Sequence, residues 1–349
     1  MQYKKLGDSE LLVSEICLGT MNYGQQNTLE EAEEQLDYAV SQGINFIDTA
    51  EMYPAPTRAE TKGKTEEYIG KWLSKQRRDQ LIIATKVSGP SGDRTLPLTW
   101  IRDGKSRIDR KNVQEAVEGS LQRLQTDYID LYQIHWPDRY VPLFGAADYD
   151  PSYERETVPI LEQLEAFVDL VKAGKIRYLG VSNETPWGVC EFCHLAQQLG
   201  LPKIGSIQNA FNLTNRVFQI HLAETCHFHK VGLIAYSTLA FGYLSGKYLC
   251  QTPAGSRVDL FPGFDKRYQK PYFHEAVKAY VEIAHKYGLT PVQLALAFVR
   301  SRWFVTSTII AASKIEQLKE NLSCVDIKLD PEILAEIDKV HARYPNPTP

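Results

Sequence analysis

The sequence is poor in the features that mark secreted, membrane-spanning and nucleic-acid-binding proteins. Its 349 residues include six cysteines, which are too scattered for the disulfide framework of a small secreted fold. No stretch approaches the ~20 apolar residues of a membrane helix, and the first residues lack the apolar segment of a signal peptide. The net charge of -4, without a block rich in Lys and Arg, argues against a nucleic-acid partner. We therefore expect a cytoplasmic protein with free thiols and no membrane contact.

Two of the cysteines have the spacing of a redox or zinc half-site. Cys190 and Cys193 stand in the sequence CEFC, and no second pair with this spacing accompanies them. A structural zinc site usually needs four ligands, so a single pair is a weak indication of a metal. We interpret both cysteines as buried helix residues and expect no metal site.

Apolar residues are plentiful and are grouped in short runs. Hydrophobic residues make up 43% of the chain and charged residues 23%, which is typical of a globular protein. The alternation around Gly7-Asp8 predicts a β-hairpin, followed by a first core strand at residues 15–18. Seven further runs that predict strands are NFID, LIIATK, IDLYQIH, IRYLGVSN, IGSIQN, GLIAYS and TSTIIAAS.

Helical patterns separate these runs. Apolar residues recur at steps of three and four, which predicts helices near residues 29–42, 64–75, 111–124, 157–173, 186–199, 216–229, 272–287 and 315–323. A last helix, LDPEILAEIDKVHARY, is expected to begin at Asp330 as its cap.

This alternation predicts an α/β fold. Continuously apolar strands covered by helices form parallel sheets, and eight such units can close into a (β/α)8 TIM barrel. The competing open, doubly wound sheet should carry GxGxxG after its first strand, where this sequence has LGTMNYG. We expect one barrel domain over residues 1–349, with an N-terminal β-hairpin and an extra C-terminal helix.

The predicted strands end in residues that can do chemistry. Asp48 ends the second strand and Tyr53 follows it, Lys86 ends the third, and His135 ends the fourth. In a barrel these ends meet on one face. A nearby ammonium lowers the pKa of a phenol, and a neutral imidazole can orient a carbonyl oxygen. The set suits carbonyl reduction, for which a nicotinamide or a flavin must supply the hydride.

Each of these residues also has a purely structural interpretation. Tyr53 is one of 19 tyrosines, Lys86 could be a strand-end lysine that faces water, and His135 could be a buried core histidine. A barrel lysine could also form a Schiff base, but this would leave the tyrosine without a role. Their joint placement at successive strand ends favours the catalytic interpretation.

At the level of whole motifs the sequence resembles the aldo-keto reductase superfamily, and within it the bacterial Tas-like NADP(H)-dependent enzymes. The motifs, in order, are GINFIDTAEMY, IIATK, LYQIHWP, GKIRYLGVSNE, IQNAFN, LIAYSTLAFGYLSGKY and IIAASKIEQLKENL. The resemblance implies a barrel that binds NADPH without a Rossmann motif and reduces aldehydes or ketones. It implies a catalytic tetrad of Asp48, Tyr53, Lys86 and His135, with Tyr53 as general acid. Because the superfamily includes potassium-channel β subunits, a cofactor-sensing regulatory subunit is the alternative.

The resemblance also implies the cofactor-binding residues. Those for the nicotinamide are Ser182, Asn183, Gln208 and Tyr236, the last stacking on the ring. The others are Gly19, Thr20, Ser237, Leu239, Lys247, Arg257, Ser313, Gln317 and Asn321. Ser313 begins a helix whose N-terminus suits the adenosine 2′-phosphate, which favours NADPH over NADH. Alternatively, Ser182, Asn183, Gln208 and Tyr236 hydrogen-bond the barrel rim. Ser313 with Glu316 also has the pattern of an ordinary capping box, which we expect together with phosphate binding.

Long segments at 88–108, 139–156 and 250–271 are expected to overhang the same mouth of the barrel. Aromatic residues in the first two, Trp100, Tyr140 and Phe144, could wall a substrate pocket. Pro54 stands where many relatives have glycine. We therefore carry over no substrate beyond a small carbonyl compound, and no oligomeric state.

Overall fold

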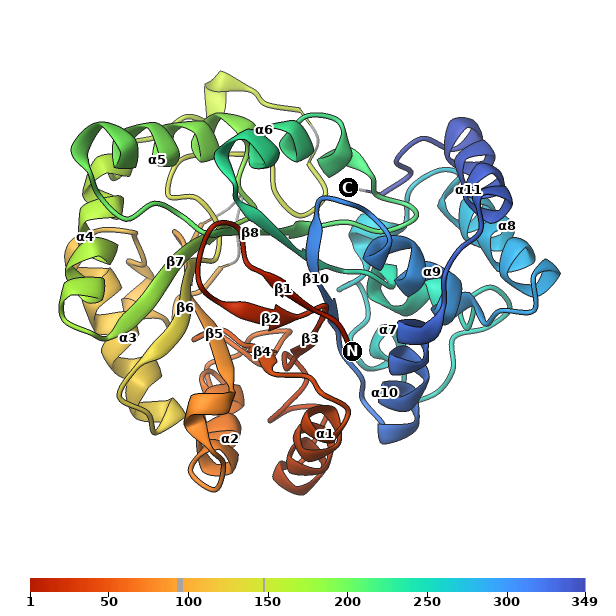
Figure 1. Cartoon of the computed structure of the whole chain (residues 1–349), viewed down its shortest axis with the longest axis horizontal. Coiled ribbons are helices and arrows are strands. Elements are labelled where there is room, and N and C mark those ends of the chain that lie inside the picture. Colours follow the sequence, from red (N-terminus) through yellow and green to blue (C-terminus); the bar gives the residue numbers. More distant parts are fainter. Residues whose placement is uncertain (93–96, 147, 349) are drawn as a thin grey trace.

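Eight parallel strands close into a barrel in which each strand pairs with the next and the last pairs with the first (Figure 1). The computed structural model describes residues 1–92, 97–146 and 148–348. The strands are β3 (Ile16–Gly19), β4 (Phe46–Asp48), β5 (Ile82–Val87), β6 (Ile129–Ile134), β7 (Ile176–Ser182), β8 (Ser206–Ala210), β9 (Gly232–Tyr236) and β10 (Val305–Ile310). All eight were predicted, and the α/β barrel fold is confirmed.

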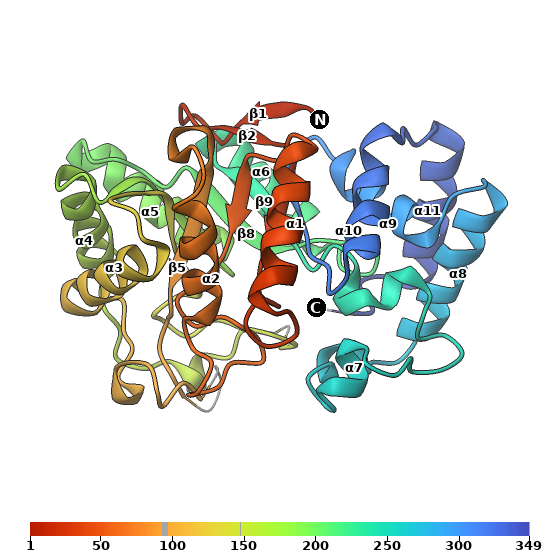
Figure 2. The ribbon, with the colours of Figure 1, turned by 90° about the horizontal axis from the view of Figure 1, so that it is seen from below.

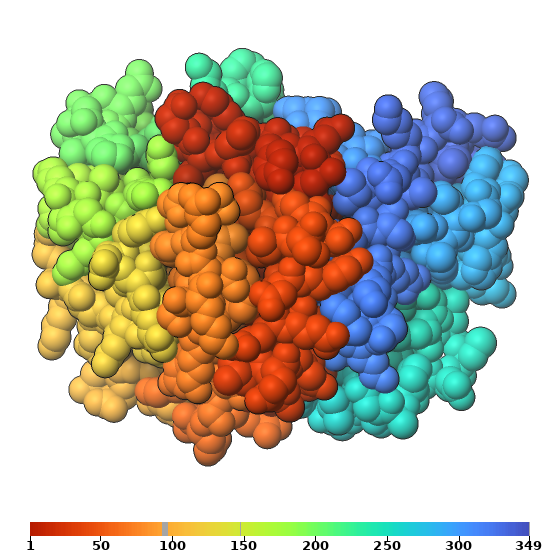
Figure 3. Space-filling view, turned by 60° about the horizontal axis from the view of Figure 1, so that its bottom comes forward, coloured from red at the N-terminus to blue at the C-terminus, as the bar shows by residue number. Residues whose placement is uncertain are grey.

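Helices surround the barrel, and the ring closes where α1 lies between α2 and α10 (Figure 3). The longer ones are α1 (Leu29–Ser41), α2 (Lys64–Leu73), α3 (Arg110–Leu124), α4 (Ile160–Lys172), α5 (Pro186–Leu199), α6 (Leu222–His229), α8 (Phe273–Lys286), α9 (Pro291–Arg300), α10 (Ile315–Leu322) and α11 (Pro331–Arg343). A short helix, α7 (Arg257–Leu260), lies in the segment after β9.

Helix α9 has no counterpart among the predicted helices. Seven of its ten residues are buried, and periodicity alone does not distinguish a short, mostly apolar run of this kind from a buried strand. A local start signal is present nonetheless, because Thr290 and Gln293 form a capping box around Pro291 at the first helical position.

The predicted hairpin closes the N-terminal end of the barrel. Strands β1 (Tyr3–Lys5) and β2 (Leu12–Ser14) pair in antiparallel register. At the turn, Gly7 has a φ of +61°, and a Cβ on it would lie 2.4 Å from the carbonyl oxygen of Gly205, so this close approach requires glycine. The hairpin and α7 lie at opposite ends of the molecule (Figure 2).

The inward-facing side chains of the barrel change from apolar to polar along the strands. Those packed against the hairpin are Cys17, Phe46, Ala84, Leu131 and Ile234. Side chains two residues apart on a strand share a face, so the next inward positions on three of these strands are Asp48, Lys86 and Gln133. All three are buried. The strand period therefore places a polar layer directly above an apolar one.

Three smaller expectations have mixed outcomes. The six cysteines are free thiols as predicted, but Cys190 is exposed, and only Cys193 of the pair is buried. Helix α11 begins at Asp330 as predicted, although this side chain makes no capping hydrogen bond. In the part of the chain that the structure describes, no helix combines the length and hydrophobicity that crossing a membrane requires.

Candidate active site

A buried ion pair lies at the centre of the polar layer. The Nζ of Lys86 lies 2.7 Å from Oδ2 of Asp48 and also donates to the carbonyl oxygen of Thr49 at 2.8 Å. Oδ1 of Asp48 accepts from the side-chain amides of Gln208, at 2.8 Å, and Gln133, at 3.2 Å. Burial favours neutral Lys86, but the charge of Asp48 and its hydrogen bond to the lysine outweigh burial and raise the pKa of Lys86. Lys86 is therefore a fixed cation.

Tyr53 lies in the connection between β4 and α2, beside this lysine. The Nζ of Lys86 is 5.2 Å from the centroid of the Tyr53 ring. Burial raises the pKa of the phenol, while Lys86 acts in the opposite direction through its charge and a hydrogen bond. The lysine thus acts as predicted, but burial dominates and the pKa of Tyr53 is raised overall. The phenol carries its proton at neutral pH.

His135 faces Tyr53 from the end of β6. The two rings are 5.6 Å apart between centroids and meet edge to face at 79°. Burial, together with the nearby charge of Lys86, lowers the pKa of His135 well below its ordinary value. Its Nδ1 has no hydrogen-bond partner among the described residues. The site therefore holds a neutral imidazole, and the four predicted catalytic residues lie together.

Two further residues of the site were not predicted, although the sequence holds a signal for each. Gln133, which donates to Asp48, stands two residues before His135 and so shares its inward face. Glu51 stands two residues before Tyr53, and its buried carboxylate accepts from the backbone N–H of Ser88 at 2.6 Å. Glu51 therefore ties the Tyr53 connection to the segment that follows β5.

Arg102 completes this tie from the long segment at 88–108. Its guanidinium donates to both oxygens of Glu51 at 2.8 Å and to Ser106 Oγ at 2.9 Å. Ser106 Oγ in turn donates to the carbonyl oxygen of Ser88 at 2.7 Å. No sequence pattern singles out this arginine. The segment after β5 thus buttresses the loop that carries Tyr53.

The predicted nicotinamide residues form a hydrogen-bonded chain next to His135. The hydroxyl of Tyr236 donates to Asn183 Oδ1 at 2.6 Å, and Asn183 Nδ2 donates to the carbonyl oxygen of His135 at 2.9 Å. Ser182 Oγ donates to the carbonyl oxygen of Gln208 at 2.7 Å. These bonds agree with the alternative that the residues stabilise the rim. They also place Tyr236 and Asn183 beside His135.

Residues expected at the pyrophosphate lie after β9. Ser237 Oγ lies 3.1 Å from the hydroxyl of Tyr268 and accepts from Arg267 at 3.2 Å. Leu239 precedes the short helix η5 (Ala240–Ser245), and Lys247 is exposed just beyond it. Arg267, which was not predicted, adds a cation to this group from the segment at 250–271.

Arg257 reaches across the mouth from α7 to the connection after β3. Its guanidinium hydrogen-bonds Asn22 Oδ1 and lies 4.9 Å from the ring centroid of Phe241. Asn22 also donates to the carbonyl oxygen of Ala312 at 3.2 Å. The segment after β9 is therefore linked to both the first and the last strand connection.

The residues expected at the adenosine end do not form the proposed capping box. Helix α10 has Lys314 at its N-cap and no side-chain cap, so the capping interpretation of Ser313 and Glu316 is wrong. Instead, Ser313 donates from N and Oγ to Gln317 Oε1, at 3.0 and 3.1 Å. Asn321 donates to the carbonyl oxygen of Ala311 at 3.2 Å.

Gly19 and Thr20 lie where β3 meets β4. Thr20 Oγ1 donates to the carbonyl oxygen of Asp48 at 2.8 Å. A Cβ on Gly19 would come within 2.6 Å of Ile309 Cγ2. Both residues therefore fix the ends of neighbouring strands in this structure.

Unpaired amide atoms gather in the connection between β3 and α1. Buried side-chain atoms of Gln25, Gln26 and Asn27 lack hydrogen-bond partners among the described residues. Asn27 Nδ2 donates to the carbonyl oxygen of Ser313 at 2.9 Å, which places this connection beside the predicted adenosine end. Buried polar groups are rarely left without partners, so atoms of this kind suit a polar ligand.

A cavity of about 1180 Å³ has Asn183 and Tyr236 in its lining, which includes none of the four predicted catalytic residues. Its wall includes Tyr140 and Phe144, as predicted for the segment at 139–156. Trp100 is not part of this lining, and its indole N–H donates to Thr57 Oγ1 at 3.3 Å. The cavity extends from the predicted nicotinamide residues to the aromatic segment after β6.

Comparison with known proteins agrees with this geometry. Residues 15–342 match the model of the Aldo/keto reductase family. The chain is 50% identical to Protein tas of Escherichia coli over 351 residues, covering 100% of both chains. It is 32% identical to the uncharacterized oxidoreductase YrpG of Bacillus subtilis, covering 99% of this chain and 97% of YrpG. A Schizosaccharomyces pombe protein named for the β subunit of a voltage-gated potassium channel is 33% identical over 97% of this chain and 92% of its own. The chain belongs to the aldo/keto reductase family and is an oxidoreductase.

Proposed function

We propose that the protein reduces aldehydes or ketones to alcohols with NADPH as cofactor, using Tyr53 as general acid. The observation that carries the proposal is the buried ion pair of Lys86 and Asp48, with its 2.7 Å contact, beside a protonated phenol and a neutral imidazole. These are the groups that a carbonyl oxygen needs as it gains negative charge.

The chemistry follows from the charges of these groups. As the carbonyl carbon is reduced, its oxygen becomes an alkoxide and takes the proton of Tyr53. The phenolate that remains lies next to the Lys86 cation, which stabilises it. Asp48 holds that cation in place, and neutral His135 donates an N–H to the carbonyl oxygen. The tetrad thus stabilises the negative charge that develops on the carbonyl oxygen.

Hydride must come from a cofactor, and a bound nicotinamide supplies it. Asn183, Ser182 and Gln208 would hold the carboxamide, and Tyr236 would cover one face of the ring. Ser237 and Arg267 provide a hydroxyl and a cation for the pyrophosphate. At the adenosine end Ser313, Gln317 and Asn321 are the polar side chains that would favour NADPH over NADH. The unpaired amides of residues 25–27 support a polar ligand there.

The test is the absorbance change of NADPH during incubation with a panel of aldehydes that includes 4-nitrobenzaldehyde, with NADH in parallel. Consumption of NADPH with formation of the alcohol, at a higher kcat/KM than with NADH, would support the proposal. Absence of turnover with all aldehydes, in a protein that has been shown to be folded, would contradict it.

The alternative is a cofactor-sensing regulatory subunit. It is favoured by the potassium-channel β subunit similarity and not by any feature of the site, because the described tetrad is complete. A protein that binds NADPH tightly but converts no carbonyl compound would match this alternative.

The six free thiols agree with our proposal that the protein works in the cytoplasm.

A further inference from the structure

The cavity lined by Asn183 and Tyr236 has more cations than carboxylates in its lining. The charged residues are Arg139, Arg155, Arg267 and Lys270 against Glu154 and Glu184. A surplus of positive charge in a partly closed space attracts anionic ligands. Which of the cations is free to bind such a ligand depends on the partner that each one already has.

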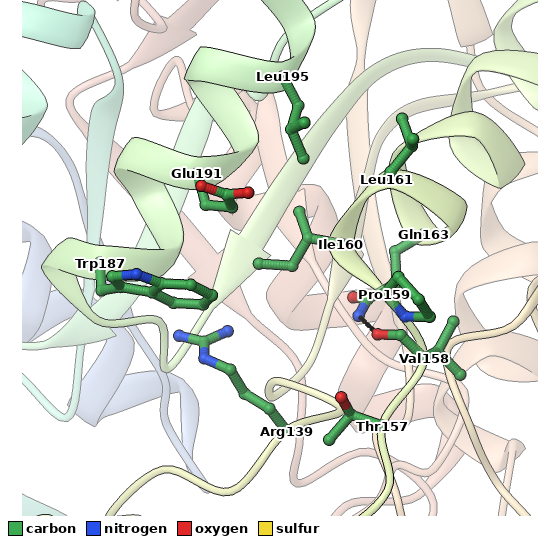
Figure 4. A pocket seen from close by; sticks show the side chains of 10 residues that line it. All are labelled: Arg139, Thr157, Val158, Pro159, Ile160, Leu161, Gln163, Trp187, Glu191 and Leu195. Atoms are coloured by element: carbon green, nitrogen blue, oxygen red, sulfur yellow. Dashed lines mark hydrogen bonds between the residues drawn. The ribbon is translucent and has the colours of Figure 1, made fainter.

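Arg139 is already fully engaged. It forms an ion pair with Glu184, donating to both carboxylate oxygens, and its guanidinium lies 4.8 Å from the ring centroid of Trp187. Figure 4 shows the guanidinium beside the indole, at the edge of a smaller hollow between α4 and α5. Arg139 and Glu184 therefore neutralise each other and leave the surplus charge to the other cations.

Lys270 has no acidic partner in the described part of the chain. Among the described residues its Nζ donates only to the carbonyl oxygen of Gly145, at 3.0 Å. An ammonium has three donors, so two remain for a ligand. The side chain is half-buried at the cavity wall, where a charge is screened less than on an open surface. Arg267, in contrast, donates to Ser237 at the proposed pyrophosphate position.

Arg155 adds a second cation on the aromatic segment. Its Nη2 donates to the carbonyl oxygen of Asp138 at 3.1 Å. The neighbouring Glu154 accepts instead from the hydroxyl of Tyr149, at 2.6 Å. Neither Lys270 nor Arg155 forms an ion pair with a carboxylate in the described chain, so both remain to attract an anion.

The part of the cavity wall that comes from the segment after β6 is aromatic. The ring centroid of Tyr140 lies 5.5 Å from that of Tyr149 and 5.4 Å from that of Tyr153. Phe144 packs edge to face on Trp136, which is adjacent in sequence to the catalytic histidine. Rings of this kind pack well against flat apolar surfaces. The cavity therefore offers an aromatic wall together with a cation.

We propose that the substrates are carbonyl compounds with a flat apolar body that ends in a carboxylate. The carbonyl lies at Tyr53, the body lies along the aromatic wall, and the carboxylate pairs with Lys270, with Arg155 adding to the attraction. This inference rests on the proposed function, because it names the substrate class of the same site.

The experiment uses two aldehydes of nearly equal shape, 4′-formylbiphenyl-4-carboxylate and its neutral carboxamide. KM and kcat are measured with NADPH for the wild type, for Lys270→Met and for the control Lys266→Met. Lys266 is exposed in the same segment and does not line the cavity. NADPH affinity is measured separately by fluorescence.

We expect the wild type to show a KM for the acid about tenfold lower than for the amide, because a charge-assisted hydrogen bond is stronger than a neutral one. K270M should reduce this ratio to about twofold without changing NADPH affinity or the constants for the amide, and K266M should keep it. The preference should also weaken with added salt. Equal KM values in the wild type, or a preference that survives in K270M, would overturn the proposal. Weaker NADPH binding in K270M would do so too, because it would assign the lysine to the cofactor.

Failure of the proposed function remains distinguishable from failure of this inference. If neither aldehyde is reduced, calorimetry compares the binding of 4′-hydroxymethylbiphenyl-4-carboxylate and its carboxamide to the NADP⁺ complex. Because a carboxylate could also bind against Tyr53 and His135, the K270M variant decides where it binds. Loss of the acid preference in K270M supports the carboxylate site even without turnover, and an unchanged preference rejects it.

Discussion

Glu51 and Arg102 form a buried ion pair with two hydrogen bonds of 2.8 Å, and Glu51 stands two residues before Tyr53 in the sequence. Their side chains are 6% and 8% exposed, so solvent screens the pair little. Glu51 also accepts from the backbone of Ser88, directly after β5. The pair therefore connects the loop that carries Tyr53 to the segment that follows the strand of Lys86.

Removing the charge of Glu51 should destabilise the protein and misplace Tyr53. Glu51→Gln leaves Arg102 buried without a counter-charge, which costs about 3 kcal/mol. We expect a lower free energy of unfolding in urea and a lower kcat. The double variant Glu51→Gln with Arg102→Met should recover stability but not kcat.

A matched control is the exposed pair of Glu10 and Lys5, with side chains 78% and 58% exposed. Glu10→Gln should change the free energy of unfolding by no more than about 0.5 kcal/mol. Comparable losses of unfolding free energy in Glu51→Gln and Glu10→Gln would contradict this prediction. Full activity in the Glu51→Gln, Arg102→Met double variant would show that Glu51 does not position Tyr53.

Tyr53→Phe should lower kcat by about 10²- to 10⁴-fold, the usual contribution of a general acid. NADPH affinity should stay within a few-fold, because the hydroxyl serves the forming alkoxide and not the cofactor. Steady-state kinetics and NADPH fluorescence titration measure the two effects. Tyr178→Phe is the control, because its hydroxyl accepts a hydrogen bond from the backbone of Glu10 at the hairpin end. Unchanged turnover in Y53F would remove the tyrosine from this role.

Lys86→Met should cost more stability than the loss of its apolar contacts explains. The substitution leaves the Asp48 carboxylate buried without its cation, which typically costs about 3–5 kcal/mol. The double variant Asp48→Asn with Lys86→Met removes that charge and should recover part of the loss, although it should remain inactive. Urea denaturation of both variants tests this. The interpretation fails if the double variant is no more stable than K86M.

The free energy of unfolding should decrease as the pH is lowered, because His135 is buried in its neutral form. The pKa of this histidine is well below its ordinary value in the folded protein, so between the two values the unfolded chain binds a proton that the native site rejects. The contribution of His135 to the free energy of unfolding is complete above its pKa in the unfolded chain, about 6.5. It is lost as the pH falls toward the pKa in the folded protein. The slope from one such group reaches about 1.4 kcal/mol per pH unit.

Urea denaturation between neutral and mildly acidic pH measures this slope. His135→Asn should reduce the slope relative to the wild type, and replacement of the exposed His194 by Asn is the control. Equal slopes in wild type and H135N would mean that the imidazole titrates normally in the folded site.

The sequence by itself determined the barrel and the location of its chemistry. Strand and helix periods are local properties of the chain, and parallel strands closed into a barrel bring their ends to one face. Asp48, Lys86 and His135 could therefore be grouped from their positions at strand ends. The same periodicity could have predicted Gln133, because it shares the inward face of His135.

Only the tertiary structure decided which partners these residues have. Arg102 meets Glu51, and Arg257 meets Asn22, because long connections fold back across the mouth, and no periodicity records such contacts. Helix α9 is buried over most of its short length, and periodicity alone does not distinguish such an apolar run from a buried strand. The raised pKa of Tyr53 likewise reflects the balance between burial and a neighbouring charge. These features depend on which parts of the chain come together and exclude water, and that is settled only by packing.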